Sequence, residues 1–348
     1  MTQVLPMRDD AASFEPETAP VALHLVPESA PVTEPVPARR RLGQSDLRVF
    51  PLAIGGNVFG WTADAGGTDR ILDTYADHGG NFIDTADSYA GGRSEIMVGN
   101  WIRARRNRSE IVVATKVGKS ADSPGVHVKA IARAVDSSLE RLGTDYIDLL
   151  YLHIDDASVP FEETLFAVDD LIRAGKVRYF GASDHSANRL IEARVIAAQL
   201  GVTPMVAVQS HYNLVHRTGF EGDLARVAEH QQLAIMPRFA LASGFLSGKY
   251  RTKADIGRNS RGREAGRYLN KRGIRILNCL DDIVTDQRAL GVVGATVASV
   301  SLAWLLTKRG VVAPVVSASL PSQVDDLVAA ATMHLSRHQL SDLDRASS

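Results

Sequence analysis

The chain has 348 residues, of which 45% are hydrophobic and 23% are charged, a composition typical of a globular protein with a sizeable core. Its formal net charge of -1 gives no electrostatic reason to expect nucleic acid or an anionic membrane as a partner. The single cysteine, Cys279, excludes an internal disulfide and a cysteine-based metal cluster. With no membrane-length apolar run and no signal-peptide pattern, these features lead us to expect a cytoplasmic protein without a metal site.

The N-terminal segment differs in composition from the rest of the chain. Residues 1–38 are rich in Pro, Ala, Glu and Val and show no hydrophobic periodicity. Such a segment buries too little apolar surface to fold alone, so we predict a disordered N-terminal tail over 1–38 and one domain over 39–348. A docking peptide is the less favoured interpretation of this tail.

From residue 52 onward, short apolar runs alternate with segments of helical periodicity, which favours a parallel sheet with helical crossovers. The expected strands are 52–57, 81–84, 111–115, 146–152, 177–182, 205–208, 233–236 and 313–316. The expected helices are 68–78, 94–103, 128–142, 165–174, 190–200, 223–230, 274–290, 296–307 and a last one from Ser322.

Eight strand and helix units in one chain predict a closed (β/α)8 TIM barrel of the α/β class. An open doubly wound sheet would usually carry a G-x-G-x-x-G turn after its first strand, and the run from Gly55 to Gly60 lacks that spacing. Residues 244–270 are rich in glycine and arginine, which indicates a long loop that is functional or disordered.

Polar residues stand where the expected strands end: Asp84, Lys116, His153, Ser183 and Gln209. In a TIM barrel these ends meet at the active-site mouth. An aspartate at the end of a buried strand is costly unless it is paired, and Lys116 on the neighbouring strand is the expected partner of Asp84.

Tyr89 lies in the loop just after Asp84. A lysine ammonium beside a tyrosine stabilises the phenolate, so we expect Tyr89 to donate a proton to a carbonyl oxygen that His153 orients. Taken singly, His153 would more often be a structural histidine, Lys116 a salt-bridge residue and Tyr89 an aromatic lid. Charged groups at consecutive strand ends favour a site over packing.

These residues carry a family resemblance. The run Asn81 to Ala86 with Tyr89 and Gly99, then Thr115-Lys116, Leu152-His153 and the run Gly175 to Ser183, resemble the aldo-keto reductase superfamily in one fixed order. The likeness extends from about Arg41 to Thr332 and is to bacterial-type NADP-dependent oxidoreductases near the potassium-channel β-subunit group. By this resemblance Tyr89 is the general acid, Lys116 and Asp84 tune it, and His153 positions the carbonyl.

The resemblance also implies a nicotinamide cofactor, usually NADPH, lying across the barrel mouth. Ser183, Asp184 and Gln209 match positions that hydrogen-bond the carboxamide, and Gly56 and Asn57 fall where the first strand meets the cofactor. The segment from Leu241 to Tyr250 matches the one that covers the pyrophosphate. The implied cofactor-binding residues are Gly56, Asn57, Ser183, Asp184, Gln209, Arg238, Phe239, Leu241, Ser243, Gly244, Leu246, Lys249, Arg261, Ser317, Ser319, Gln323 and Asp326.

Two residues depart from the family pattern. Asp184 replaces the usual asparagine, so an amide that donates and accepts becomes an acceptor only, and we expect retuned binding. Arg238 stands where many members place an aromatic that stacks on the nicotinamide, and its charge would disfavour the cationic oxidised ring. Arg261, after Ser260, resembles the arginine that contacts the 2′-phosphate in some branches, although a solvated loop arginine is an equal alternative.

Three functions follow as hypotheses. The leading one is reduction of a small-molecule aldehyde or ketone by NADPH, with Tyr89 as general acid. The second is an NADP-binding regulatory or sensing barrel with little turnover, as in the channel β-subunits, which the pattern Ser317-Ala318-Ser319 with Gln323 also resembles. The third is a Schiff-base aldolase that uses Lys116, since the same fold hosts that chemistry. The choice of carbonyl substrate depends on the shape of the loops, and the sequence alone does not determine that shape.

Overall fold

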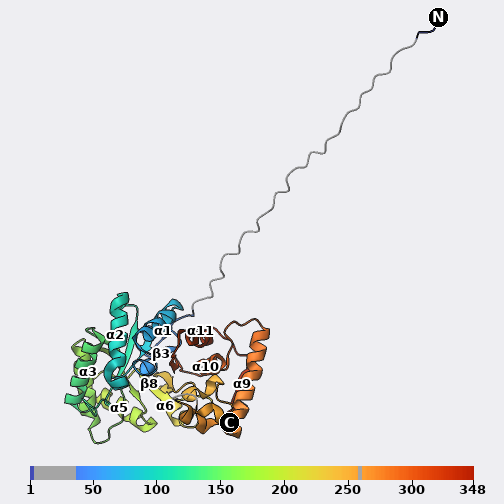
Figure 1. Ribbon diagram of the computed structural model, residues 1–348. Coiled ribbons are helices and arrows are strands. Elements are labelled where there is room, and N and C mark those ends of the chain that lie inside the picture. The colour runs from blue at the N-terminus through green and yellow to red at the C-terminus, as the bar shows by residue number, and fades with distance from the viewer. Residues whose placement is uncertain (4–36, 258–260) are drawn as a thin grey trace. The chain divides into compact units, whose positions relative to one another are not determined.

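The protein is an eight-stranded parallel barrel with helices on its outside (Figure 1). The computed structural model describes residues 1–3, 37–257 and 261–348. The strands follow one another in the order β10-β3-β4-β5-β6-β7-β8-β9. Their bounds are β3 (Ala53–Gly55), β4 (Phe82–Asp84), β5 (Val112–Val117), β6 (Ile147–Leu152), β7 (Val177–Ser183), β8 (Ala207–His211), β9 (Ala234–Arg238) and β10 (Val315–Val316).

Ile235 closes the ring of strands. Its backbone N–H donates to the carbonyl of Gly310 at 2.9 Å, and its carbonyl accepts from Val312 N–H at 3.0 Å, so β9 is tied to the segment that leads into β10. All eight predicted strands are therefore present and the predicted TIM barrel is confirmed. The predicted disordered tail falls almost wholly on residues 4–36, which lie outside the described residues, and the boundary at 38 stays a prediction.

Several of the crossover helices begin and end at residues suited to capping. Ser186 accepts a hydrogen bond from Arg189 N–H at the start of α5, which ends at Gly201 with a φ of 66°. The helices are α1 (Ala65–Asp77), α2 (Arg93–Arg105), α3 (Val128–Leu142), α4 (Phe161–Arg173), α5 (Ala187–Leu200), α6 (Asp223–His230), α9 (Lys271–Ala289), α10 (Val297–Leu306) and α11 (Pro321–Val328).

Several local predictions need correction. The expected loop 244–270 contains η3 (Ala242–Ser247), α7 (Lys253–Ile256), α8 (Gly262–Ala265) and η4 (Gly266–Tyr268). Their short, glycine-rich sequences show no helical periodicity, and packing against the barrel holds them. A further helix, α12 (Arg337–Ala346), follows the predicted last one because Ser336 and Gln339 form a capping box. Residues Lys116 and Gln209 lie inside β5 and β8 instead of just after them.

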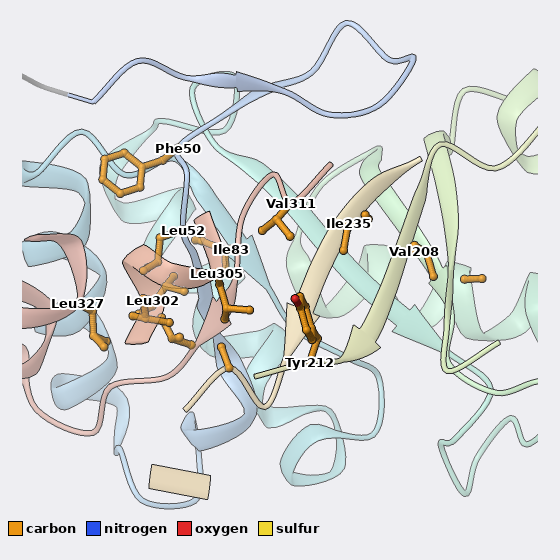
Figure 2. Close-up of a cluster of buried hydrophobic side chains, with 14 of the residues drawn as sticks. Phe50, Leu52, Ile83, Val208, Tyr212, Ile235, Leu302, Leu305, Val311 and Leu327 are labelled. Atoms are coloured by element: carbon orange, nitrogen blue, oxygen red, sulfur yellow. The ribbon is translucent and has the colours of Figure 1, made fainter. Parts of the chain in front are cut away.

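Side chains alternate between the two faces of each strand, and the outward ones form the main core (Figure 2). Ile83 and Val208 belong to this cluster with Leu302 and Leu305 of α10. Because α10 is buried on nearly all sides, its apolar residues are not confined to one stripe. Within residues 1–3, 37–257 and 261–348, every helix falls short of what is needed to cross a membrane.

The inward side chains fill the lower part of the barrel. A hairpin of β1 (Arg40–Arg41) and β2 (Arg48–Val49) precedes the barrel, and its apolar residues Leu42, Leu47 and Val49 are buried against inward-facing residues such as Phe82. This end of the barrel is thereby plugged by apolar side chains, and access to the interior is from the carboxyl ends of the strands.

Candidate active site

The candidate catalytic residues occupy the inward positions at the carboxyl ends of the strands. Phe82 belongs to the cluster inside the barrel, and Asp84, two residues later on β4, has the same orientation because side chains alternate with a period of two. The same spacing relates Ala114 to Lys116 on β5 and Tyr151 to His153 after β6. The same alternation of side chains along the strands therefore places apolar residues inside the barrel and polar residues at its mouth.

Asp84 is the centre of a buried polar network. Its Oδ1 accepts a hydrogen bond from Lys116 Nζ, and its Oδ2 accepts one from Gln209 Nε2 at 2.8 Å. The ammonium of Lys116 also donates to the carbonyl oxygen of Thr85 at 2.9 Å. The side chains of Asp84 and Lys116 are only 2% and 1% exposed, so the pairing predicted from the sequence is present and both charges are compensated.

Lys116 is held in its protonated form. Burial alone would lower the pKa of Lys116, but the negative charge of Asp84 and the neighbouring Tyr89 outweigh it and hold that pKa above its ordinary value. A lysine that stays protonated is a poor nucleophile, so this environment suits electrostatic stabilisation and disfavours the Schiff-base alternative.

Tyr89 begins the short helix η2 (Tyr89–Gly92), which follows β4. Tyr89 lines the cavity at the barrel mouth, and Ala90, Gly91 and Gly92 directly after it all have positive φ, so the chain turns tightly there. Lys116 Nζ lies 5.2 Å from the centre of the Tyr89 ring, and the His153 ring meets it edge-on at a centroid distance of 6.1 Å. The four predicted catalytic residues are thus brought together.

His153 is neutral in this environment. Burial, with the positive charges of Lys116, Lys119 and Arg238, lowers the pKa of His153 to about 2. Its Nδ1 is buried and has no hydrogen-bond partner among the described residues. A neutral imidazole in contact with the tyrosine offers a donor or an acceptor to a carbonyl oxygen without adding a charge.

A cavity of about 780 Å³ opens above these residues and extends across the mouth toward β10 and α11. Asp84, Tyr89 and His153 line it, and so do fourteen of the predicted cofactor residues. Those fourteen are Asn57, Asp184, Gln209, Arg238, Phe239, Leu241, Ser243, Gly244, Lys249, Arg261, Ser317, Ser319, Gln323 and Asp326.

Three predicted cofactor residues and one catalytic residue do not line this cavity: Gly56, Ser183, Leu246 and Lys116. A side chain at Gly56 would come within 2.5 Å of Ser94 Oγ, so close packing accounts for that glycine. Leu246 is fully buried in the outer core. Lys116 is buried and hydrogen-bonded to Asp84, so it acts on the cavity through its neighbours. The Ser183 hydroxyl is buried and has no partner among the described residues.

The far end of the cavity is polar and is formed by β10 and α11. Ser317 Oγ donates to Asn57 Oδ1 at 2.6 Å, which joins the ends of β10 and β3. Gln323 Oε1 accepts from the backbone N–H of Ser319 at 2.8 Å at the start of α11. Hydroxyls and a side-chain amide at this end suit a polar, largely uncharged group such as a nucleoside.

Lys249 and Arg261 are two partly buried cations that line the cavity. Burial lowers the pKa of Lys249, and the nearby charge of Arg261 lowers it further. Burial also lowers the pKa of Arg261, whose guanidinium lies 5.4 Å from the centre of the Trp61 ring. Two partly buried cations that repel each other suit an anionic ligand, so the residues present fit the phosphates of a dinucleotide. Ser260, which precedes Arg261, lies outside the described residues.

The two residues that depart from the family pattern contact each other. Arg238 Nε donates to Asp184 Oδ1 at 2.8 Å, and Arg238 Nη2 lies 2.8 Å from Asp184 Oδ2, so the pair is bidentate. The guanidinium also lies 4.7 Å from the centre of the Phe239 ring. Asp184 therefore does not present a free carboxylate to the cavity, as the sequence suggested it would.

Some lining residues were not anticipated. Lys119, three residues after Lys116, lines the cavity beside the Asp184–Arg238 pair, and its place in a loop after a strand was a usable signal. Thr296 and Ala298, at the start of α10, carry no such signal because helix packing alone brings them there. In the described part of the chain, His, Cys, Asp and Glu side chains do not gather in a group of three or more able to hold a metal ion.

A parallel barrel with Tyr89, Lys116, Asp84 and His153 at its mouth is typical of TIM-barrel enzymes. Comparison with known proteins shows the family to which this barrel belongs. The model of the aldo/keto reductase family matches residues 51–348. The chain therefore belongs to the aldo/keto reductase family. Membership supports an oxidoreductase that acts on carbonyl groups.

The individual relatives differ in the functions for which they are named. The chain is 32% identical over 317 residues to norsolorinic acid reductase of Aspergillus flavus, covering 86% of this chain and 78% of that protein. It is 33% identical over 296 residues to a probable voltage-gated potassium channel subunit beta of Arabidopsis thaliana, covering 82% and 89%. It is also 30% identical over 334 residues to an aryl-alcohol dehydrogenase of Pestalotiopsis microspora, covering 89% and 84%.

Proposed function

We propose that this protein reduces a small-molecule aldehyde or ketone to an alcohol with NADPH, and that Tyr89 is the general acid. The observation that carries the proposal is the buried Lys116–Asp84 pair beneath Tyr89, with the neutral His153 ring against the tyrosine. Bound NADPH supplies the hydride, which carries two electrons to the carbonyl carbon.

The protein's own residues supply the proton and the orientation. As the carbonyl oxygen becomes an alkoxide it takes the phenolic proton of Tyr89, so the substrate gains one hydride and one proton in total. The phenolate left behind is stabilised by the ammonium of Lys116, whose other donors are fixed on Asp84 and Thr85. His153, neutral and in contact with the Tyr89 ring, orients the carbonyl oxygen toward that proton.

Other residues would hold the cofactor. We assign Lys249 and Arg261 to its phosphates, because they are partly buried cations that line the cavity close to each other. Ser317, Ser319 and Gln323 would contact the adenosine end, and Gln209 and Ser183 the nicotinamide carboxamide. We also propose a cytoplasmic location, in keeping with a single free cysteine, Cys279.

The test is Tyr89→Phe, which removes the proton and keeps the ring. NADPH oxidation is followed over aliphatic, sugar and aromatic carbonyls, the aromatic ones chosen because a relative is an aryl-alcohol dehydrogenase. We expect kcat to fall about 10²–10⁴-fold while the Kd for NADPH, measured by fluorescence, changes little. Activity that is insensitive to this substitution would contradict the proposed mechanism.

A second candidate function is an NADP-binding regulatory barrel with little turnover, which the similarity to channel β-subunits favours. It predicts that the wild-type protein binds NADPH but does not oxidise it measurably with any carbonyl in the panel. The Tyr89→Phe variant would then be indistinguishable from wild type in every assay.

A further inference from the structure

The bidentate pair of Asp184 and Arg238 joins two strand ends that are not adjacent. Asp184 follows β7 with a φ of 61°, Arg238 ends β9, and β8 lies between them in the sheet. The side chains are 36% and 26% exposed, so the pair is partly shielded from water. Each residue alone would add an uncompensated charge to the mouth, and together they cancel.

The pair lies at the reaction end of the cavity. Asp184 and Arg238 line the cavity together with Tyr89 and His153. The positive charge of Arg238 contributes, after burial and the two lysines, to the lowered pKa of His153, so its field reaches the proposed carbonyl site. A hydride donor must lie within contact distance of that carbonyl, and hence close to this pair.

The charge of the nicotinamide ring distinguishes the two forms of the cofactor. The reduced ring is neutral and the oxidised ring is a cation, whereas the phosphates and the adenosine are the same in both. A lone Arg238 guanidinium would therefore weaken binding of the oxidised form, and a lone Asp184 carboxylate would strengthen it. The ratio of the two affinities therefore depends mainly on the charge at this end of the cavity, because the rest of the cofactor is the same in both forms.

We propose that Asp184 is the charge-compensating and positioning partner of Arg238, and that this pair sets the relative affinity of the site for oxidised and reduced nicotinamide cofactor. The inference rests on the proposed function, because it requires the cofactor to bind in this cavity. By cancelling Arg238, Asp184 keeps the oxidised product form from being repelled while the guanidinium stays fixed over Phe239.

Neighbouring charges do not provide the same compensation. Lys116 is already paired with Asp84 at the base of the site. Lys119 is a further cation near the pair; burial lowers its pKa, the charge of Asp184 opposes that effect and the charge of Arg238 adds to it. Asp184 is thus the carboxylate that balances the cations on this side of the mouth, and its removal leaves them unopposed.

The experiment measures Kd for NADP⁺ and for NADPH with Asp184→Asn, Arg238→Met and the double variant. Asparagine is isosteric with aspartate and tolerates the left-handed backbone at position 184. We expect the ratio of the NADP⁺ Kd to the NADPH Kd to rise about tenfold in Asp184→Asn, as for unit charges several ångströms apart in a partly shielded site. It should fall in Arg238→Met and return close to wild type in the double variant.

Asp73 and Arg105 provide a matched control. They form a bidentate pair between the outer helices α1 and α2, with both side chains 38% exposed. Asp73→Asn and Arg105→Met should leave the ratio within about twofold of wild type, since exposed pairs act weakly over distance. Thermal melting of every variant checks that the fold is retained.

The possible results distinguish failure of this inference from failure of the proposed function. A pair that only clamps β7 to β9 predicts lower melting temperatures with an unchanged ratio, and that result overturns the inference while leaving the proposed function intact. A ratio that moves in the same direction in both single variants also overturns it. Wild-type protein that binds neither form of the cofactor refutes the proposed function, and the inference with it.

Discussion

The two ends of the barrel interior are made by the same strands and the same alternation of side chains, yet they are opposites chemically. The lower end is apolar and is plugged by Leu42, Leu47 and Val49 of the N-terminal hairpin. The upper end buries the charges of Asp84 and Lys116. Burial stabilises the lower end directly, whereas at the upper end it is tolerated only because each charge has a partner. A fold accepts such an arrangement where function requires it.

Breaking the upper pair should have the largest effect on stability. Asp84→Leu leaves the Lys116 ammonium buried without its carboxylate, and we expect the free energy of unfolding to fall by about 3–5 kcal/mol. Urea denaturation measures the change. The double variant Asp84→Leu with Lys116→Met removes both charges and should recover most of the loss, and a double variant as unstable as the single one would contradict a pairing effect.

Damaging the lower end should cost less and should spare the chemistry. Leu47→Ala opens a cavity in the apolar plug, and we expect a loss of about 3 kcal/mol in the free energy of unfolding. Carbonyl reduction by the protein that remains folded should be unchanged. Arg48→Ala, at the exposed position next to Leu47, is the control and should change stability by less than about 0.5 kcal/mol.

The neutral state of His153 gives the upper end a dependence on pH. In the unfolded chain a histidine takes up a proton near pH 6.5, but in the folded protein the pKa of His153 is about 2. The unfolded state therefore binds more protons between these values, and the free energy of unfolding falls as pH decreases below 6.5. From pH 6.5 to pH 5 this contributes about 2 kcal/mol.

The comparison with His153→Gln isolates this contribution. Denaturation at several pH values gives the slope of the free energy of unfolding against pH. This slope should be steeper in wild type by the equivalent of about one proton per molecule. Equal slopes would mean that His153 is protonated in the folded protein.

The smallest expected effect is on cofactor binding, when one of the two cations Lys249 and Arg261 that line the cavity is removed. Arg261→Ala should weaken NADPH binding about tenfold, as for loss of a charge-assisted contact, and change NADH binding less than about twofold. Fluorescence titration measures both. Arg263→Ala, an exposed arginine on the same short helix, is the matched control. Equal weakening of both cofactors would place Arg261 away from the 2′-phosphate.

Much of the site was accessible from the sequence because it depends on strand order. Once eight strands were recognised, Asp84, Lys116 and His153 had to meet at one mouth, since the carboxyl ends of parallel strands share one edge. The short helices between 242 and 268 were not accessible, because sequences of three to six residues have no periodicity and packing decides their conformation. The close packing at Gly56 was hidden for a similar reason, since Ser94 comes from a distant helix.

The sequence by itself determined the barrel, the identity of the residues at its strand ends and the pairing of Asp84 with Lys116, because hydrophobic periodicity and the cost of buried charge are local or nearest-neighbour effects. Only the tertiary structure decided that Asp184 and Arg238, which the sequence presents as two separate departures, are one ion pair. They lie on strands separated by β8, and the curvature of the barrel brings their side chains together across it.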